Sequence, residues 1–200
     1  PLSLGEALAE TRATSDSNDA RLAVPKVAFE VLHRINKVTP IMPSALVTFS
    51  LLDNDDKAMT VEEGRRVLKP LPDYFKRRGL DLSEDLDLED YGGLYDALRT
   101  LEREGVIRRY TDGPEDIYWI AENRAHEAAF YRNTLIHHLI TRAICEVALV
   151  RVAQEEADDV ANAMWEEVVR LRDVLKYEFF FPRTTHFAAD VANEVDIAYP

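Results

Sequence analysis

The sequence contains a single cysteine, Cys145, among its 200 residues. One thiol excludes a disulfide framework and any zinc site built on several cysteines. Cys145 adjoins Ile144 on the apolar side of an expected helix. We therefore predict a buried and unreactive thiol.

Long apolar runs are also missing. The longest stretch without a charged residue, 38–52, has 15 residues and contains Pro40 and Pro43, whereas a membrane span needs about 20 residues. The first residues show neither an initiator methionine nor a signal-peptide pattern. We therefore expect a soluble fragment of a longer chain.

Positive charge is scarce. The chain has 24 Lys and Arg residues against 37 Asp and Glu, which gives a formal net charge of -13. Non-specific nucleic-acid binding and a broad polybasic membrane patch both need a basic surface, so we predict no nucleic-acid partner. Apolar residues make up 46% of the chain, which is enough for the core of one sizeable domain.

Motifs that carry chemistry are absent from the sequence. No serine lies in a G-x-S-x-G elbow, no histidine lies in an HExxH pattern, and no glycine-rich phosphate loop exists. The adjacent His137 and His138 would point about 100° apart on a helix and cannot easily share a metal ion. The acidic run Asp53–Asp56 lacks the glycine and the later glutamate of a calcium loop. We therefore predict no metal ion, no cofactor and no catalytic site.

Apolar residues at helical spacing dominate the chain. They predict helices over about 22–36, 45–52, 61–78, 94–104, 122–154, 158–177 and 186–195. Thr60 and Glu63 form a capping-box pattern, so a helix should begin at Val61. Pro70 and Pro72 should then kink or break it. The acidic segment 81–90 is expected to be a solvated loop.

Two short β-like runs, 106–110 and 117–120, flank a turn sequence and predict a β-hairpin. Helices followed by such a hairpin are typical of a winged helix. Residues 53–104 carry 15 acidic side chains against 9 basic ones, the opposite of what a DNA reader needs. This subdomain is therefore expected to pack against protein.

The fold class expected is mainly α. It comprises a helical domain with a winged-helix-like subdomain, one small β-hairpin and a long antiparallel helical hairpin. The expected divisions are a connecting segment with the first helix (1–39), the winged-helix-like subdomain (40–121), and the helical hairpin with an aromatic C-terminal segment (122–200).

An aromatic run, Phe179, Phe180 and Phe181, follows Tyr177. Three consecutive Phe residues cannot all face one core while they remain helical. Either they form an edge that contacts a membrane or another domain, or the chain turns and buries Phe180 on the other side from its neighbours.

Three segments resemble one family. Residues 29–52, FEVLHRINKVTPIMPSALVTFSLL, resemble the region after the catalytic domain of the membrane-bound bacterial glycerol-3-phosphate acyltransferases, which carries an INxVTPxxPxxLV pattern. YRNTLIH (131–137) is similar to the family's YRNxxxH segment. LRDVLKYEFFFP (171–182) resembles its LRxLLKFEFFF segment, especially in the actinobacterial branch, and PLSLGEAL (1–8) resembles the chain after the acyltransferase domain.

The resemblance implies a peripheral membrane enzyme of phospholipid synthesis at the cytoplasmic side of the cell membrane. It would transfer an acyl group from acyl-CoA or acyl carrier protein to glycerol 3-phosphate. The family's catalytic H-x-x-x-x-D motif, in which the histidine is the general base, lies upstream. His186 and Asp190 have only three residues between them. The resemblance thus implies an inactive C-terminal domain whose partner is the upstream acyltransferase domain of the same chain.

Six polar residues occupy positions that match the family's motifs: Arg34, Asn36, Tyr131, Arg132, Asn133 and His137. We expect a hydrogen-bond network between the helix of the first two and the helix of the other four. The alternative is ordinary surface polarity.

Two other classes of function stay open. The chain could be a winged-helix protein-binding or regulatory module. In a DNA-binding winged helix, Lys and Arg should dominate the helix 94–104 and the wing. Near the wing, Arg108 and Arg109 are the only bases. A plain helical scaffold or oligomerisation domain is the third option.

Overall fold

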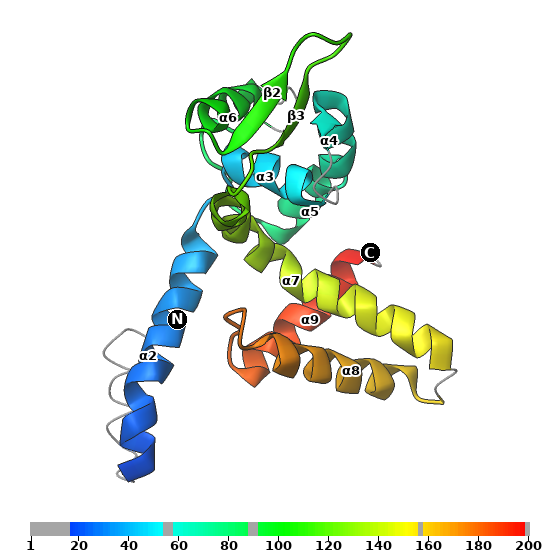
Figure 1. Cartoon of the computed structure of the whole chain (residues 1–200). Coiled ribbons are helices and arrows are strands. Elements are labelled where there is room, and N and C mark those ends of the chain that lie inside the picture. The colour runs from blue at the N-terminus through cyan, green and yellow to red at the C-terminus, as the bar shows by residue number, and fades with distance from the viewer. Residues whose placement is uncertain (1–16, 54–57, 88–91, 156–157, 199–200) are drawn as a thin grey trace. The chain divides into compact units, whose positions relative to one another are not determined.

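A computed structural model describes residues 17–53, 58–87, 92–155 and 158–198 (Figure 1). The chain forms two compact units. The helical unit comprises Pro1–Val38 and Ile144–Ala192, and the winged-helix unit comprises Thr39–Ala143 and Asn193–Pro200. The predicted division at residues 39 and 121 stays a prediction.

The described part of the chain is mainly helical, as expected. The helices are α2 (Ser17–Val38), α3 (Pro43–Asp53), α4 (Val61–Leu68), α5 (Leu71–Arg78), α6 (Gly92–Arg103), α7 (Ala125–Glu155), α8 (Val160–Leu175) and α9 (Thr184–Ala198). The strands are β1 (Met59–Thr60), β2 (Ile107–Tyr110) and β3 (Ile117–Ile120).

The winged-helix unit contains a three-stranded antiparallel sheet in the order β1-β3-β2. The hairpin of β2 and β3 confirms the expected pair, and Tyr118 of β3 pairs with Arg109 on one side and Met59 on the other. β1 was not expected, because two residues are too short to show a strand's alternation. The order of helices and strands is that of a winged helix.

The core of this unit surrounds α3, the helix that lies within the uncharged segment of the sequence. Seven of its eleven residues are buried, and α3 packs against α4, α6 and β3. Leu46 meets the same core as Phe75 of α5, Leu101 of α6, Ile107 of β2 and Leu135 of α7. Burying one such side chain contributes about 1.5–3 kcal/mol, so these contacts hold the unit together.

Local signals set the ends of α4 and α5. Thr60 Oγ1 accepts from the Glu63 backbone at 3.2 Å, and the Thr60 N–H donates to Glu63 Oε2 at 2.8 Å. These bonds confirm the capping box and lower the pKa of Glu63. α4 ends before Pro70, as predicted, and Gly79 ends α5 with a φ of 62° that favours glycine.

The described part of the acidic segment is more than a solvated loop. Its backbone pairs with Ile41, two residues before α3: the Ile41 N–H donates to Asp81 O at 2.9 Å, and the Ser83 N–H donates to Ile41 O at 3.0 Å. Leu86 is buried in the core. The leucines between the acids therefore anchor the segment. The expected features at residues 1–8, 11–16, 54–56 and 88–90 lie outside the described residues.

The helical unit includes α8, which follows α7 after a connection of four residues and runs back in the opposite direction (Figure 1). Asp159 caps α8, because its Oδ1 accepts from the Asn162 backbone at 3.1 Å. Val168 of α8 and Phe187 of α9 are fully buried, and Cys145 is buried as predicted. None of the helices described is long and apolar enough to cross a membrane.

Two helical glycines give a matched test of this packing. A Cβ at Gly93 would collide with the backbone oxygen of Asp85, whereas a Cβ at Gly64 would meet only Met59 Sδ at 3.5 Å and Ser50 Cβ at 3.9 Å. Gly93→Ala should lower the free energy of unfolding by about 1–3 kcal/mol. Gly64→Ala should raise it by about 1 kcal/mol through helix propensity. Urea unfolding measures both, and shifts of the same sign would contradict this packing.

Candidate functional site

Two of the polar residues that match the family's motifs, Arg34 and Asn36, lie on α2, and Arg34 makes a local contact. Arg34 Nε donates to Glu30 Oε1 at 2.8 Å, one helical turn earlier, and both side chains are about one-third exposed. Asn36 is half-buried. An exposed pair at this spacing contributes about 0.3–0.5 kcal/mol, so it steadies α2 only slightly.

The four matching residues on α7 also have local partners. Tyr131 Oη donates to Glu104 Oε2 at 3.0 Å, Arg132 Nη2 donates to Asn133 Oδ1 at 2.9 Å, and His137 Nδ1 lies 3.2 Å from the backbone oxygen of Asn133. Asn133 is exposed and the others are half-buried. Partial burial, with a smaller effect of Glu104, raises the pKa of Tyr131. The expected network with α2 would join the two units and stays a prediction.

The aromatic run occupies the segment between α8 and α9. Phe179, Phe180 and Phe181 are all half-buried. Phe180 meets Phe29 edge-on at 5.1 Å, and Phe181 meets the buried Phe187 edge-on at 5.5 Å. Neighbouring rings thus have different aromatic partners within the helical unit. Their contact with a membrane or another domain stays a prediction.

A buried polar cluster that the sequence did not reveal lies in the winged-helix unit. Glu194 of α9 is only 4% exposed. Its Oε1 accepts from Tyr74 Oη at 3.0 Å and forms an ion pair with Arg78 Nε at 3.1 Å. Tyr74 Oη also lies 3.2 Å from the backbone oxygen of His138, and Arg142 stacks over the Tyr74 ring at 4.8 Å. The cluster therefore joins α5, α7 and α9.

Two physical effects act on the Tyr74 hydroxyl within the cluster. Burial, then the Glu194 carboxylate, raises the pKa of Tyr74 and keeps its hydroxyl protonated. Only one sequence signal pointed to Glu194, its place on the helical stripe that begins with Phe187 and Val191. Its partners are more than a hundred residues away in the sequence, so spacing could not identify them.

His138 is the buried histidine of this region. Burial first, and then His137, lowers its pKa to about 4. Its Nε2 lies 3.4 Å from the backbone oxygen of Thr39. The ring is therefore neutral near pH 7 and acts in packing. Across the described ranges, no group of three or more His, Cys, Asp or Glu side chains could hold a metal ion.

An apolar cavity of about 40 Å³ lies among α3, α4, α6, β1 and β3. Its lining residues include Val47, Leu51, Met59, Gly64 and Leu98. A cavity measured in this way needs about 10–15 Å³ to hold one water, so a volume of about 40 Å³ is too small for a fatty acyl chain.

Fold and contacts together define a mainly helical domain with a winged-helix unit and a buried structural cluster. The chain matches the family described as "Glycerol-3-phosphate acyltransferase C-terminal region" over residues 1–198. It therefore belongs to this family, which confirms the resemblance found in the sequence.

Its relatives include proteins from Mycobacterium bovis and from two strains of Mycobacterium tuberculosis, each named "Putative acyltransferase plsB1". Each is 34% identical to this chain over 197 residues. The match covers 98% of this chain and 31% of the relative. The chain thus spans less than a third of the length of these relatives.

The buried cluster predicts a strong effect of Glu194. Glu194→Ala removes the acceptor of Tyr74 and leaves Arg78 without this ion pair, so it should lower the free energy of unfolding by about 3 kcal/mol. Glu62→Ala is the matched control, because the Glu62–Arg65 pair is partly exposed and its atoms are 3.9 Å apart. The control should change stability by less than about 0.5 kcal/mol. Equal losses in denaturant unfolding would contradict the role of the cluster.

His138 predicts a pH dependence. Its pKa is about 4 in the folded protein and about 6.5 in an unfolded chain. The unfolded state therefore binds the extra proton first as the pH falls from 6.5 to 4, and stability drops by up to about 3 kcal/mol. His138→Gln should flatten this part of the stability profile, and His126→Gln, at an exposed position, should not. Identical profiles for the wild type and His138→Gln would refute the prediction.

Proposed function

We propose that this chain is the C-terminal accessory domain of a glycerol-3-phosphate 1-O-acyltransferase and packs on an acyltransferase domain in the same chain. In the proposed reaction, the sn-1 hydroxyl oxygen of glycerol 3-phosphate attacks the thioester carbonyl of acyl-CoA or acyl carrier protein. An ester forms, the carbon–sulfur bond breaks and the thiol leaves. The reaction would occur at the cytoplasmic face of the cell membrane. The family match supports this proposal.

The catalytic residues would lie in the upstream domain. The H-x-x-x-x-D arrangement, which the sequence resemblance assigns to catalysis, occurs nowhere in these 200 residues. The curated relatives are about three times as long as this chain, since the match covers 31% of them. An accessory role accounts for both facts.

The observation that carries the docking proposal is the apolar face of α2. Phe29, Leu32, Ile35 and Val38 are 49%, 40%, 51% and 71% exposed. Each is three residues from the next and neighbours it on the helix surface, so the four form a strip that winds about half-way around α2. A contiguous exposed apolar strip marks a contact surface. α2 is the first described helix along the chain. In the relatives, the remaining length precedes the family's C-terminal region, so an upstream acyltransferase domain would adjoin the α2 end of the chain. We therefore assign the strip to that domain.

The ion pairs of the winged-helix unit favour this accessory role over DNA binding. Arg99 on α6 pairs with Asp96, and Arg109 on β2 pairs with Asp116. The hydrogen bond that Arg109 Nη2 donates to Asp116 Oδ2 raises the pKa of Arg109. Two of the bases that a winged helix would present to phosphates are therefore already neutralised by acids of the same unit.

The test is acyl transfer by the full-length protein, with the isolated chain in parallel. Glycerol 3-phosphate and palmitoyl-CoA are supplied, and formation of lysophosphatidic acid is followed. We expect turnover by the full-length protein only. Folded full-length protein that is inactive with both CoA and carrier-protein donors would overturn the proposed activity, and turnover by the isolated chain would overturn the accessory role.

The docking surface is tested in the same assay with Phe29→Ser/Ile35→Ser/Val38→Ser. This variant should lower full-length turnover by about tenfold or more, because an apolar contact with the acyltransferase domain is lost. The matched control, Val150→Ser/Val160→Ser/Val174→Ser, changes three valines of α7 and α8 that are similarly exposed. Equal turnover by the two variants would argue against docking through α2.

A further inference from the structure

A second cavity of the winged-helix unit, of about 230 Å³, opens to solvent beside the first turns of α7. The residues that line it belong to the link between α6 and β2 and to the N-terminal end of α7: Glu104, Val106, Arg124, Glu127, Phe130 and Tyr131. One water needs about 10–15 Å³ by the same measure. The cavity therefore has room for a whole side chain of another molecule.

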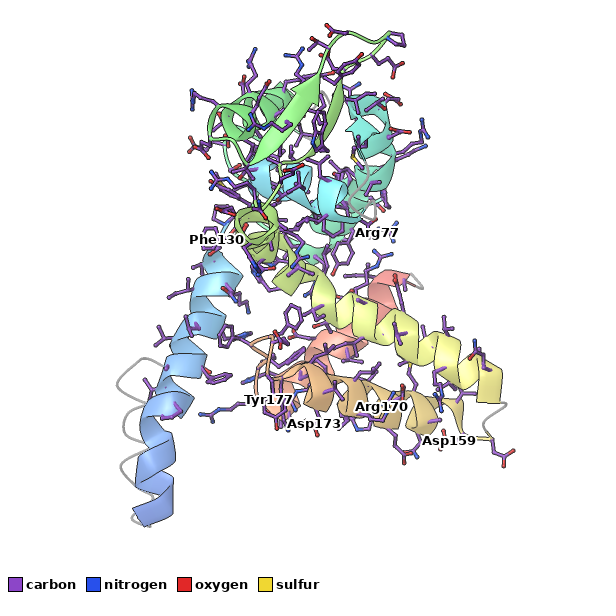
Figure 2. The ribbon with its side chains drawn as sticks, in the orientation of Figure 1. Arg77, Phe130, Asp159, Arg170, Asp173 and Tyr177 are labelled. Carbon is purple, nitrogen blue, oxygen red and sulfur yellow. The ribbon has the colours of Figure 1, made fainter. Side chains whose placement is uncertain are left out.

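Two aromatic rings line this cavity. Phe130, labelled in Figure 2, is 70% exposed, so most of its ring is accessible to a ligand. The half-buried Tyr131 ring meets it edge-on, with the centroids 6.0 Å apart and the planes at 78°. Val106, which is buried, adds an apolar surface. Ring faces attract cations, and apolar linings accept the alkyl part of a long side chain.

The one cation among the lining residues, Arg124, is engaged by its neighbours. Its Nε donates to Gly105 O at 3.3 Å, and its Nη2 donates to Glu104 O at 3.0 Å. Its Nη1 donates to Glu127 Oε1 at 2.6 Å. All three nitrogens of the guanidinium thus have partners. Arg124 ties the C-terminal end of α6 to α7 and balances the charge of Glu127.

Glu104 carries the remaining charge of the cavity. Its Oε2 accepts from Tyr131 Oη at 3.0 Å, which holds the carboxylate next to the aromatic rings. It forms no ion pair with any residue in the described ranges. Since Arg124 balances Glu127, the lining has one net negative charge. The complementary ligand is therefore a cation.

Arginine is the cation whose shape fits these groups. Its flat guanidinium can stack on an aromatic ring while its edge donates parallel hydrogen bonds to a carboxylate. Its alkyl stem would lie along the apolar lining. Arginine is also enriched among the side chains that contribute most to protein interfaces. The net charge of -13 favours encounter with a basic partner.

We propose that this cavity binds an arginine side chain presented by a partner protein. The Glu104 carboxylate accepts hydrogen bonds from the guanidinium, and the Phe130 ring stacks on it. The site lies entirely within the winged-helix unit, so the inference goes beyond the proposed acyltransferase function and does not depend on it. It gives this unit a protein-binding role through α7 rather than through the wing.

The experiment measures binding of the tripeptide acetyl-Gly-Arg-Gly-amide to the 200-residue chain by ligand-observed saturation-transfer NMR. The same tripeptide with citrulline in place of arginine is the matched ligand control, because citrulline has nearly the same shape and no charge. Methylguanidine, the head group alone, distinguishes a free small cation from a protein side chain.

Three variants test the site residues. Glu104→Gln removes the charge and keeps an oxygen that accepts from Tyr131. Phe130→Leu removes the ring and keeps an apolar side chain. Glu122→Gln is the matched control, because it makes the same change in charge at an exposed residue outside the cavity. Circular dichroism checks that every variant is folded.

We expect the wild type to bind the arginine tripeptide with a dissociation constant in the millimolar range that rises with salt. The citrulline tripeptide and methylguanidine should each bind about fivefold or more weakly. Glu104→Gln and Phe130→Leu should each weaken binding about threefold, and their combination about tenfold. Glu122→Gln should bind like the wild type.

Equal binding of the arginine and citrulline tripeptides would overturn the proposal, as would wild-type affinity in the combined variant. Absence of binding to the wild type would also overturn it. Methylguanidine that binds as tightly as the arginine tripeptide would overturn the assignment to a protein side chain and identify a site for a small free cation. Since no readout uses acyl transfer, each of these outcomes leaves the proposed function to its own test.

Discussion

The winged-helix unit depends on the burial of α3. Its segment lacks charged side chains from Pro43 to Leu52, and most of the helix is inaccessible to water. A helix that is apolar on every side is stable only when other elements surround it. α4, α6 and β3 pack directly on it, so the hairpin of β2 and β3 is held in place through this shell.

A buried carboxylate, Glu194, fixes the last turns of α9 to α5. Glu194 lies where an apolar residue would be expected, and Tyr74 and Arg78 compensate for its burial. Such a group costs more when it loses a partner than it contributes when satisfied. The C-terminal end of α9 therefore has one favoured position on α5. The same helix, through Phe187, takes part in the core of the helical unit.

The structural features that could be predicted from the sequence are those that depend on residues close together in the chain. Helical spacing located α2, α7 and α8, and the capping box located the start of α4, because these signals act within one or two turns. β1 and the buried Leu86 escaped prediction, since their environment comes from distant segments. The same limit applies to sites: residues that matched the family's motifs could be named, whereas the pairing of Glu194 with Tyr74 exists only in the folded chain.

The central claim is that α2 is covered by an acyltransferase domain in the full-length protein. Hydrogen–deuterium exchange of residues 29–38, compared between the full-length protein and the isolated chain, tests it most directly. Contact with another domain slows the local opening that exchange requires. We predict slower exchange of this segment in the full-length protein, with α8 unchanged. Equal exchange of residues 29–38 in the two proteins would contradict the account.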